Sequence, residues 1–401
     1  MIRVEGQKSA LPDVDVLFYD GALGRIPATG DGIAIAVGVK DTSGTATANQ
    51  VYRLFLPNDY EKAIELFGGT FADKLLDAVS NGQGIVYAIS AASNTSADIL
   101  TAIEAAVDQS LVNGDALFEY IAVLTPVDKT LATSIESYLS SLVSRHIYVW
   151  AIVEARDKNP DTTVEPDYDT YVTNLINEWS GFNALRTFVV AAYATFTNIK
   201  GNQGHRNGLG SIMGLISRAK VSQDIGEVGA FSIKNLVSLP DGLTYSHIYT
   251  LDQAGFITIR TYDGYAGYYV TNPVAMNDPT SDYHFMYARR VADKAAKLSR
   301  KAVMKYLKGE ILPPNNQDPS NPVKPTKSPT VQELKAKIEH ALKVGMYDQK
   351  ELYGYRVYIP EGQDIWASRE LNVYTKLIPT PHMDWIEIHQ SFENPLLEIG
   401  G

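Results

Sequence analysis

The stretch Ile33-Ala34-Ile35-Ala36-Val37-Gly38-Val39 decides the fold of the first half of the chain. It is short, continuously apolar and rich in β-branched residues, which is typical of a strand buried on both faces of a sheet. Similar stretches lie at residues 85–89, 120–124, 147–153 and 187–194. Predicted helices alternate with them at residues 60–67, 73–79, 96–110, 131–144 and 169–179. This alternation favours a mainly parallel sheet with helices on both faces.

The pattern changes after residue 230. Residues 256–262 alternate apolar and polar side chains, Asp263-Gly264 predicts a turn, and residues 267–270 return as a second strand of a hairpin. A long amphipathic helix is predicted over residues 281–308. Another helix is predicted at 331–344, followed by strands at 355–359, 371–378 and 385–389. This order of a hairpin, two helices and further strands indicates a second domain of the α+β type.

Both ends of the chain predict strands outside the packed domains. Near the N-terminus, Val14, Val16 and Phe18 occupy alternate positions before the turn residues Asp20-Gly21. Near the C-terminus, the corresponding strand residues are Trp385, Ile386, Ile388 and Phe392. A lone strand must pair with a sheet edge, either in its own chain or in another copy.

The fold class is therefore mixed α/β with extended β arms at both termini. We expect an N-terminal arm over residues 1–30 and a mainly parallel α/β domain over 31–230. A C-terminal α+β domain then covers 231–378, with an exposed Pro-rich loop at 311–329, and a C-terminal arm covers 379–401.

Composition narrows the classes of function. A chain of 401 residues is long enough for two or more domains. The net charge of −11 argues against general binding to nucleic acid or anionic membrane. The sequence has no cysteine, which excludes disulfides, thiolate nucleophiles and Cys-ligated zinc. Its apolar stretches are much shorter than the ~20 residues of a membrane span, so we expect no membrane anchoring.

A glycine-rich loop at residues 201–210 is the strongest candidate for a ligand site. Glycines before a helix can cradle phosphate, but a P-loop also needs a lysine, and Gly210 is followed by Ser211-Ile212. The favoured interpretation is a flexible connection or close helix packing. The histidines are scattered, and no Gly-x-Ser-x-Gly motif is present. We therefore expect no catalytic residue, no bound cofactor and no metal site.

The predicted helix at 281–308 is strongly basic within this acidic chain. Its basic residues include Arg289, Arg290, Lys294, Lys297, Arg300 and Lys301. One interpretation is a solvated helix face, and the other is a docking surface for an acidic partner. No aromatic and basic nucleic-acid-binding module accompanies the helix, so we expect no nucleic-acid partner.

The segment from residue 243 to 309 resembles the contractile tail sheath family. The resemblance rests on Gly255-Phe256-Ile257-Thr258-Ile259-Arg260, on Gly267-Tyr268-Tyr269-Val270 and on Arg289-Arg290-Val291-Ala292-Asp293. It continues in Tyr355-Arg356-Val357-Tyr358-Ile359-Pro360 and in Trp385-Ile386-Glu387-Ile388. The order of these elements, more than any one of them, makes the resemblance.

The resemblance implies a structural subunit and not an enzyme. Such subunits polymerise as stacked rings around an inner tube and contract to drive the tube through a cell envelope. Their terminal arms add strands to the sheets of neighbouring copies. The implied partners are other copies of the chain, an inner tail tube protein, and baseplate and tail terminator proteins. The implied location is a virion tail or injection particle assembled in the bacterial cytoplasm.

Two expectations about individual residues follow from the resemblance. The strand residues named above at the two termini are expected to pair with other copies. The six basic residues of the 281–308 helix are expected to include the charges that face the tube. Two alternatives stay open: an α/β enzyme with an appended β domain, and another structural component of a tail or baseplate.

Overall fold

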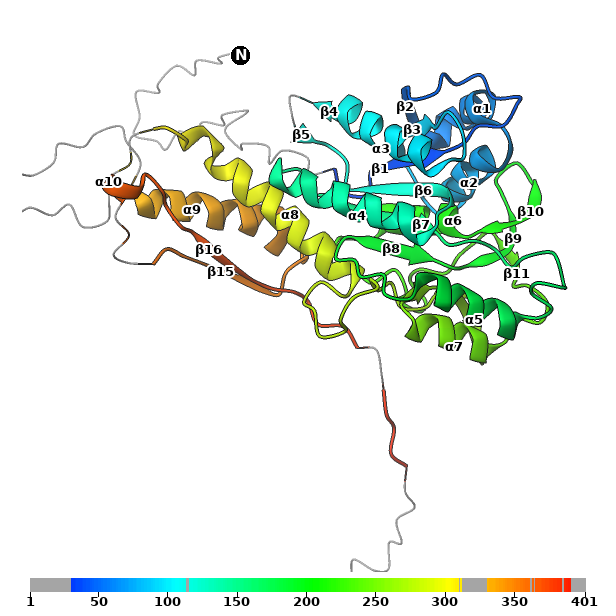
Figure 1. Cartoon of the computed structure of the whole chain (residues 1–401). Helices are drawn as coiled ribbons and strands as arrows, with labels where there is room; N and C mark the ends of the chain where they lie inside the picture. Colours follow the sequence, from blue (N-terminus) through cyan, green and yellow to red (C-terminus); the bar gives the residue numbers. More distant parts are fainter. Residues whose placement is uncertain are drawn as a thin grey trace, which may run out of the picture.

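The computed structural model describes residues 30–112, 115–309, 311, 330–360, 363, 365–383 and 386–390. A seven-stranded sheet forms the centre of the α/β body, in the strand order β12-β8-β7-β6-β1-β3-β2 (Figure 1). These strands are β1 (Ala34–Gly38), β2 (Val51–Phe55), β3 (Ile85–Ser90), β6 (Tyr120–Pro126), β7 (Trp150–Glu154), β8 (Thr187–Val190) and β12 (Phe256–Ile257). All neighbours are parallel except β2, which pairs antiparallel with β3 at one edge.

Helices cover both faces of this sheet. One face packs against α1 (Leu56–Phe67), α2 (Gly69–Ser80) and α6 (Leu209–Arg218). The other packs against α3 (Ser96–Ser110), α4 (Lys129–Ser144), α5 (Tyr168–Trp179) and α7 (Tyr245–Gln253). Neighbouring residues of one strand point to opposite faces, so Ala34 and Ile35 enter different cores. The predicted parallel sheet with two covered faces is confirmed.

Two predicted strands are each divided in the structure. The stretch at 187–194 becomes β8 and β9 (Tyr193–Thr197), because the chain leaves the large sheet. Strand β9 is the centre of a small sheet with β10 (Gln203–Asn207) and β11 (Leu236–Ser238). The stretch at 256–262 becomes β12 and β13 (Ile259–Tyr262), and β13 pairs with β14 (Tyr265–Val270) in the predicted hairpin. Strands β11 and β12 thus belong to sheets of the α/β body.

The glycine-rich loop is part of a close helix packing. Residues 203–207 form β10, and α6 begins directly afterwards. A Cβ atom on Gly210 would lie 2.2 Å from the carbonyl oxygen of Lys74 in α2. A Cβ atom on Gly214 would lie 2.4 Å from the carbonyl oxygen of Ala78. Glycine therefore lets the backbones of α6 and α2 approach each other. This agrees with the predicted close helix packing, one of the two interpretations of the loop.

The C-terminal part packs around one long helix. Helix α8 (Met286–Val303) lies beside α9 (Val331–Leu342), and a two-stranded sheet covers them (Figure 1). The sheet consists of β15 (Gly354–Tyr358) and β16 (Tyr374–Ile378), with the short helix α10 (Ile365–Ser368) between them. Two further short elements of this part are η1 (Met304–Tyr306) and η2 (Lys343–Tyr347). In the α/β body, β4 (Leu111–Val112) and β5 (Asp115–Ala116) form a small hairpin. Most of the predicted loop at 311–329 lies outside the described residues.

Helix α8 is shorter than the predicted helix at 281–308. Phe285, the residue before it, has an extended backbone and forms a β-bridge with Val274. The helical stripe predicted from residue spacing is nevertheless present. Val291, Ala295 and Leu298 are buried in a core with residues of α9, η2 and β15.

A buried ion pair joins α8 to the α/β body. The side chains of Arg290 and Glu119 are 1% and 6% exposed, and Nη2 of Arg290 lies 3.1 Å from Oε2 of Glu119. The guanidinium group also donates to the carbonyl oxygens of Ile216, Ala219 and Lys220 at 3.2–3.3 Å. These carbonyls lie at the C-terminal end of α6, where the helix dipole favours a cation. The pair therefore connects α8, α6 and the start of β6.

Gly214→Ala should lower the free energy of unfolding by roughly 1–3 kcal/mol, because the added methyl group overpacks a rigid backbone contact. Urea unfolding followed by circular dichroism measures the loss. The control is Gly84→Ala, whose Cβ would meet no atom nearer than 3.7 Å. Equal losses in the two variants would contradict the packing role of Gly214.

Arg290→Met should lower the free energy of unfolding by about 3–5 kcal/mol, because it leaves the Glu119 carboxylate buried without its cation. The double variant Arg290→Met/Glu119→Gln should regain part of this loss, since no uncompensated charge then remains. Lys337→Met, at an exposed position of α9, is the matched control. A loss in Arg290→Met no larger than in this control would show that the pair does not hold the two parts together.

Candidate functional site

Among the described residues, neither edge of the β15–β16 sheet is paired with a further strand. One face packs on α8 and α9 through Val357 and Leu377. Packing on the helices stabilises this two-stranded sheet, but an unpaired edge is a template for another strand.

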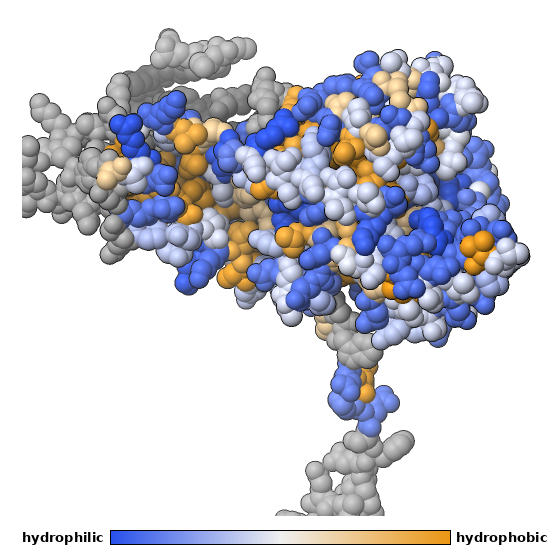
Figure 2. Space-filling view, viewed as in Figure 1, coloured by the Kyte–Doolittle hydropathy of each residue, from blue (hydrophilic) through white to orange (hydrophobic). Residues whose placement is uncertain are grey.

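Aromatic side chains are concentrated on and beside this sheet. Tyr358 and Tyr374 stack across the two strands, with ring centroids 5.1 Å apart. Tyr353, just before β15, is 73% exposed, and Ile378 at the end of β16 is 50% exposed. Figure 2 shows hydrophobic surface at this end of the molecule, among residues of the C-terminal part. Tyrosine is favoured at interfaces that are partly apolar and partly wet, so the sheet has the composition of a contact surface.

The terminal arms can be placed in part. Val14, Val16, Phe18, Trp385 and Phe392 lie outside the described residues. Ile386 and Ile388 are described, and they are 67% and 76% exposed. Residues 386–390 form no strand in the described structure, and in Figure 1 they run away from the body. The strand predicted at 385–389 is therefore not formed within the subunit.

The basic helix needs a correction. Arg289, Arg290 and Lys294 are 5%, 1% and 8% exposed, so they offer no surface to a tube. The physical reason is that α8 is enclosed between the α/β body and α9, where buried carboxylates compensate its charges. Arg289 pairs with Asp293, and Lys294 lies 2.6 Å from Glu351.

The remaining basic residues of α8 lie closer to the surface. Lys297 is partly buried and donates from Nζ to the carbonyl oxygen of Phe118 at 2.9 Å. Arg300 is half-buried and Lys301 is exposed. Glu119, the partner of Arg290, could not be found from sequence, because the two residues are 171 positions apart. For Arg300 and Lys301 the tube-facing role stays a prediction.

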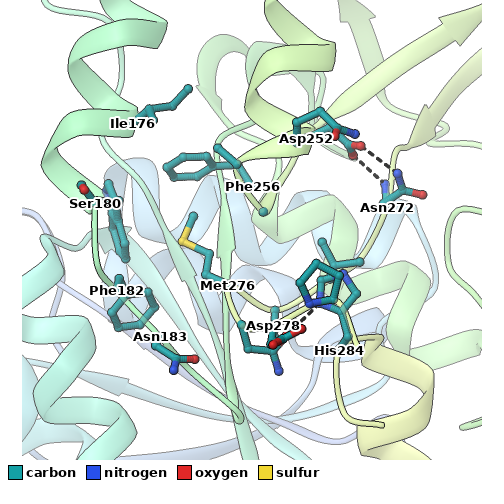
Figure 3. Close-up of a pocket in the computed structure, with 18 of the residues that line it drawn as sticks. Ile176, Ser180, Phe182, Asn183, Asp252, Phe256, Asn272, Met276, Asp278 and His284 are labelled. Carbon is teal, nitrogen blue, oxygen red and sulfur yellow. Dashed lines mark hydrogen bonds between the residues drawn. The ribbon is translucent and has the colours of Figure 1, made fainter. Parts of the chain in front are cut away.

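A cavity of about 640 Å³ lies beside β12, between the end of α5 and residues 272–285. Figure 3 shows Phe182 and Asn183 on one side, Asp252, Asn272 and His284 on the other, and Met276 between them. Two pairs of its polar groups bond to each other: Asn272 Nδ2 donates to Asp252 Oδ2 at 2.8 Å, and His284 Nδ1 lies 2.8 Å from Asn277 Oδ1. The Nδ2 atom of Asn277 is buried and has no hydrogen-bond partner among the described residues. Burial lowers the pKa of His284.

In the part of the chain that the structure describes, no group of three or more His, Asp or Glu side chains is arranged to hold a metal ion. Within the same residues, none of the helices combines the length and apolar character needed to cross a bilayer.

Three solved structures similar to this chain are described as sheaths or sheath proteins. The helical sheath of the anti-feeding prophage in its contracted state has a TM-score of 0.64 at 15% identity, covering 96% of this chain and 100% of that chain. The contracted PVC sheath complex of an extracellular contractile injection system has a TM-score of 0.61 at 14% identity, covering 98% and 100%. The sheath tail protein Lin1278 of Listeria innocua has a TM-score of 0.54 at 10% identity, covering 88% and 96%.

These likenesses confirm, at the level of the fold, the resemblance and the fold class seen in the sequence. Among curated protein sequences, no relative matches this chain. Two family descriptions do match: "DUF2586, N-terminal domain" over residues 11–273 and "DUF2586, C-terminal domain" over residues 282–397. The chain therefore belongs to the DUF2586 family, and its fold is that of contractile sheath proteins.

Proposed function

We propose that this protein is the structural subunit of a contractile sheath, which polymerises around an inner tube and contracts to drive the tube through a cell envelope. The observation that supports this most is the open β15–β16 sheet in a chain that has the sheath fold over nearly its whole length. The work is mechanical, so the protein is not an enzyme and needs no cofactor. Its partners are other copies of itself, an inner tail tube protein, and baseplate and terminator proteins of a particle assembled in the cytoplasm.

In this proposal the terminal arms complete the open sheet of neighbouring copies. Ile386 and Ile388 are two residues apart, so in an extended strand both point to one side. That apolar side fits the face of a sheet that packs on α8 and α9. The N-terminal arm, with Val14, Val16 and Phe18, has the same alternation and is assigned to the other edge. Added strands would extend the backbone hydrogen bonding of a sheet that already packs on two helices.

The tube contact is assigned to the C-terminal end of α8, where Arg300 and Lys301 lie. The basic residues earlier in the helix are excluded from this contact because they are buried. An acidic patch on the tube would attract them by charge complementarity, which supplies orientation and association rate more than affinity.

The alternative function, an α/β enzyme, would place convergent reactive groups in the cavity beside β12. There, Asp252 and His284 each bond to a neighbouring asparagine, and this pairing gives that alternative no support.

Removal of either arm should leave a folded monomer that does not polymerise. The variants lack residues 1–20 or 382–401, and their circular dichroism should match the intact chain, because the described helices and strands lie between residues 34 and 378. Negative-stain microscopy should show hollow tubes for the intact protein and single particles for both variants. Tubes from either shortened chain would contradict the role of the arms.

A finer version of this test uses the two sides of the C-terminal segment. Ile386→Lys/Ile388→Lys places charges on the apolar side and should abolish the tubes. Glu387→Lys/His389→Lys adds lysines at the alternating positions, which are directed to the other side of an extended strand, and should leave tubes intact. The assignment fails if both double variants polymerise equally well.

Reversal of charge at the exposed end of α8 should separate sheath from tube. Arg300→Glu/Lys301→Glu is expected to polymerise but to give empty sheaths when the tube protein is supplied. Lys62→Glu, at an exposed position of α1, serves as the control. Co-sedimentation with the tube protein measures the difference, and normal binding by the double variant would move the tube contact elsewhere.

A further inference from the structure

The first described residues pack closely between two backbone segments, at Leu117 and at Ser217. Gly30 and Gly32 both have positive φ angles, of 77° and 72°. A Cβ atom on Gly30 would lie 2.4 Å from the carbonyl carbon of Leu117, and one on Gly32 would lie 2.8 Å from the carbonyl oxygen of Ser217. Glycine suits both the backbone angles and the space. The start of the α/β domain is thus held between these two segments, directly after the N-terminal arm.

Charged residues on two neighbouring turns of α8 bind Asp31 directly and Gly32 through Glu119. Oδ2 of Asp31 lies 2.6 Å from Nζ of Lys294, and that ammonium group lies equally close to Oε2 of Glu351. The backbone N–H of Gly32 donates to Oε2 of Glu119 at 2.6 Å, and Glu119 pairs with Arg290. Arg290 and Lys294 are four residues apart, so they lie on one face of the helix. The residues that follow the N-terminal arm are therefore attached to α8.

The beginning of the same helix contacts the start of the C-terminal arm. The rings of Tyr287 and His382 have centroids 4.0 Å apart. Tyr287 stacks in turn on Phe285, with centroids 5.4 Å apart. The chain then passes Met383, which is 75% exposed, and leaves the body. Both arms thus start from contacts with one stretch of α8, between residues 287 and 294.

We propose that α8 is the common anchor of both arms, so that a load on either arm passes into this helix and from it into the α/β body. This inference rests on the proposed function, because it assumes that the arms bear load between subunits. Lys294 and Arg290 are positioning residues for the N-terminal arm, and Tyr287 is one for the C-terminal arm. Lys294 and Arg290 are nearly buried, whereas the Asp31 side chain is 33% exposed, so salt screens these ion pairs less than pairs in which both partners are on the surface.

Hydrogen exchange of the monomer tests the attachment without any polymer. In Lys294→Met, the amides of Gly32 and Ile33 should exchange at least about tenfold faster, because local opening no longer breaks an ion pair. Asp31→Asn should have the same effect. Exchange in β6 is the internal reference and should not change, which separates local opening from global unfolding. Lys337→Met is the matched control. Unchanged exchange in both Lys294→Met and Asp31→Asn would overturn the proposal.

Mechanical resistance of the assembled tubes tests the transfer of load. Lys294→Met and Tyr287→Ala keep both arms, so they should polymerise, but their tubes should break at lower shear and at lower urea concentration than the unmodified tubes. Tubes as resistant as those of Lys337→Met would overturn the role of α8 even if exchange is faster. If the unmodified chain forms no tubes, the proposed function fails, whereas the exchange experiment still decides whether α8 holds the residues after the arm.

Discussion

The enclosure of α8 between the α/β body and the C-terminal part is the constraint on which the rest of the structure depends. A helix in that position must be buried on more than one side, so its charged residues need partners inside the protein. Arg290 satisfies this need with Glu119 and with carbonyl groups at the end of α6. Lys294 satisfies it with Asp31 and Glu351. These contacts join segments from almost the whole chain and make one rigid unit of two parts.

The edges of the large sheet and of the β15–β16 sheet differ. The large sheet is covered on both faces, and at its β2 edge Gln109 and Asp59 accept hydrogen bonds from backbone N–H groups. These side chains occupy two backbone N–H groups of β2 and so make that edge less available to other strands. The β15–β16 sheet differs, because it exposes tyrosines and is followed along the chain by a segment with exposed isoleucines. In the proposed sheath, other copies would complete this last sheet.

Strong periodic signals were sufficient for most of the α/β body. The helix at Ser96–Ser110 was predicted to the residue, because its apolar spacing is regular. In the structure, Thr95 is its N-cap. Strand β2 and helix α7 were missed. In β2 one of five residues is buried, and α7 buries Ile248 and Leu251 alone. Elements at the edge of a fold leave a weak pattern in the sequence, because few of their side chains enter the core.

The sequence by itself determined the alternation of strands and helices, the change of pattern after the α/β body, and the apolar alternation of the terminal segments. These are local properties, because they depend on the spacing of side chains along one element. Tertiary structure alone decided which charges of α8 are buried and which sheet remains open. A basic residue looks the same in sequence whether it faces water or a buried carboxylate. The difference lies in partners such as Glu119, which only folding brings into contact with α8.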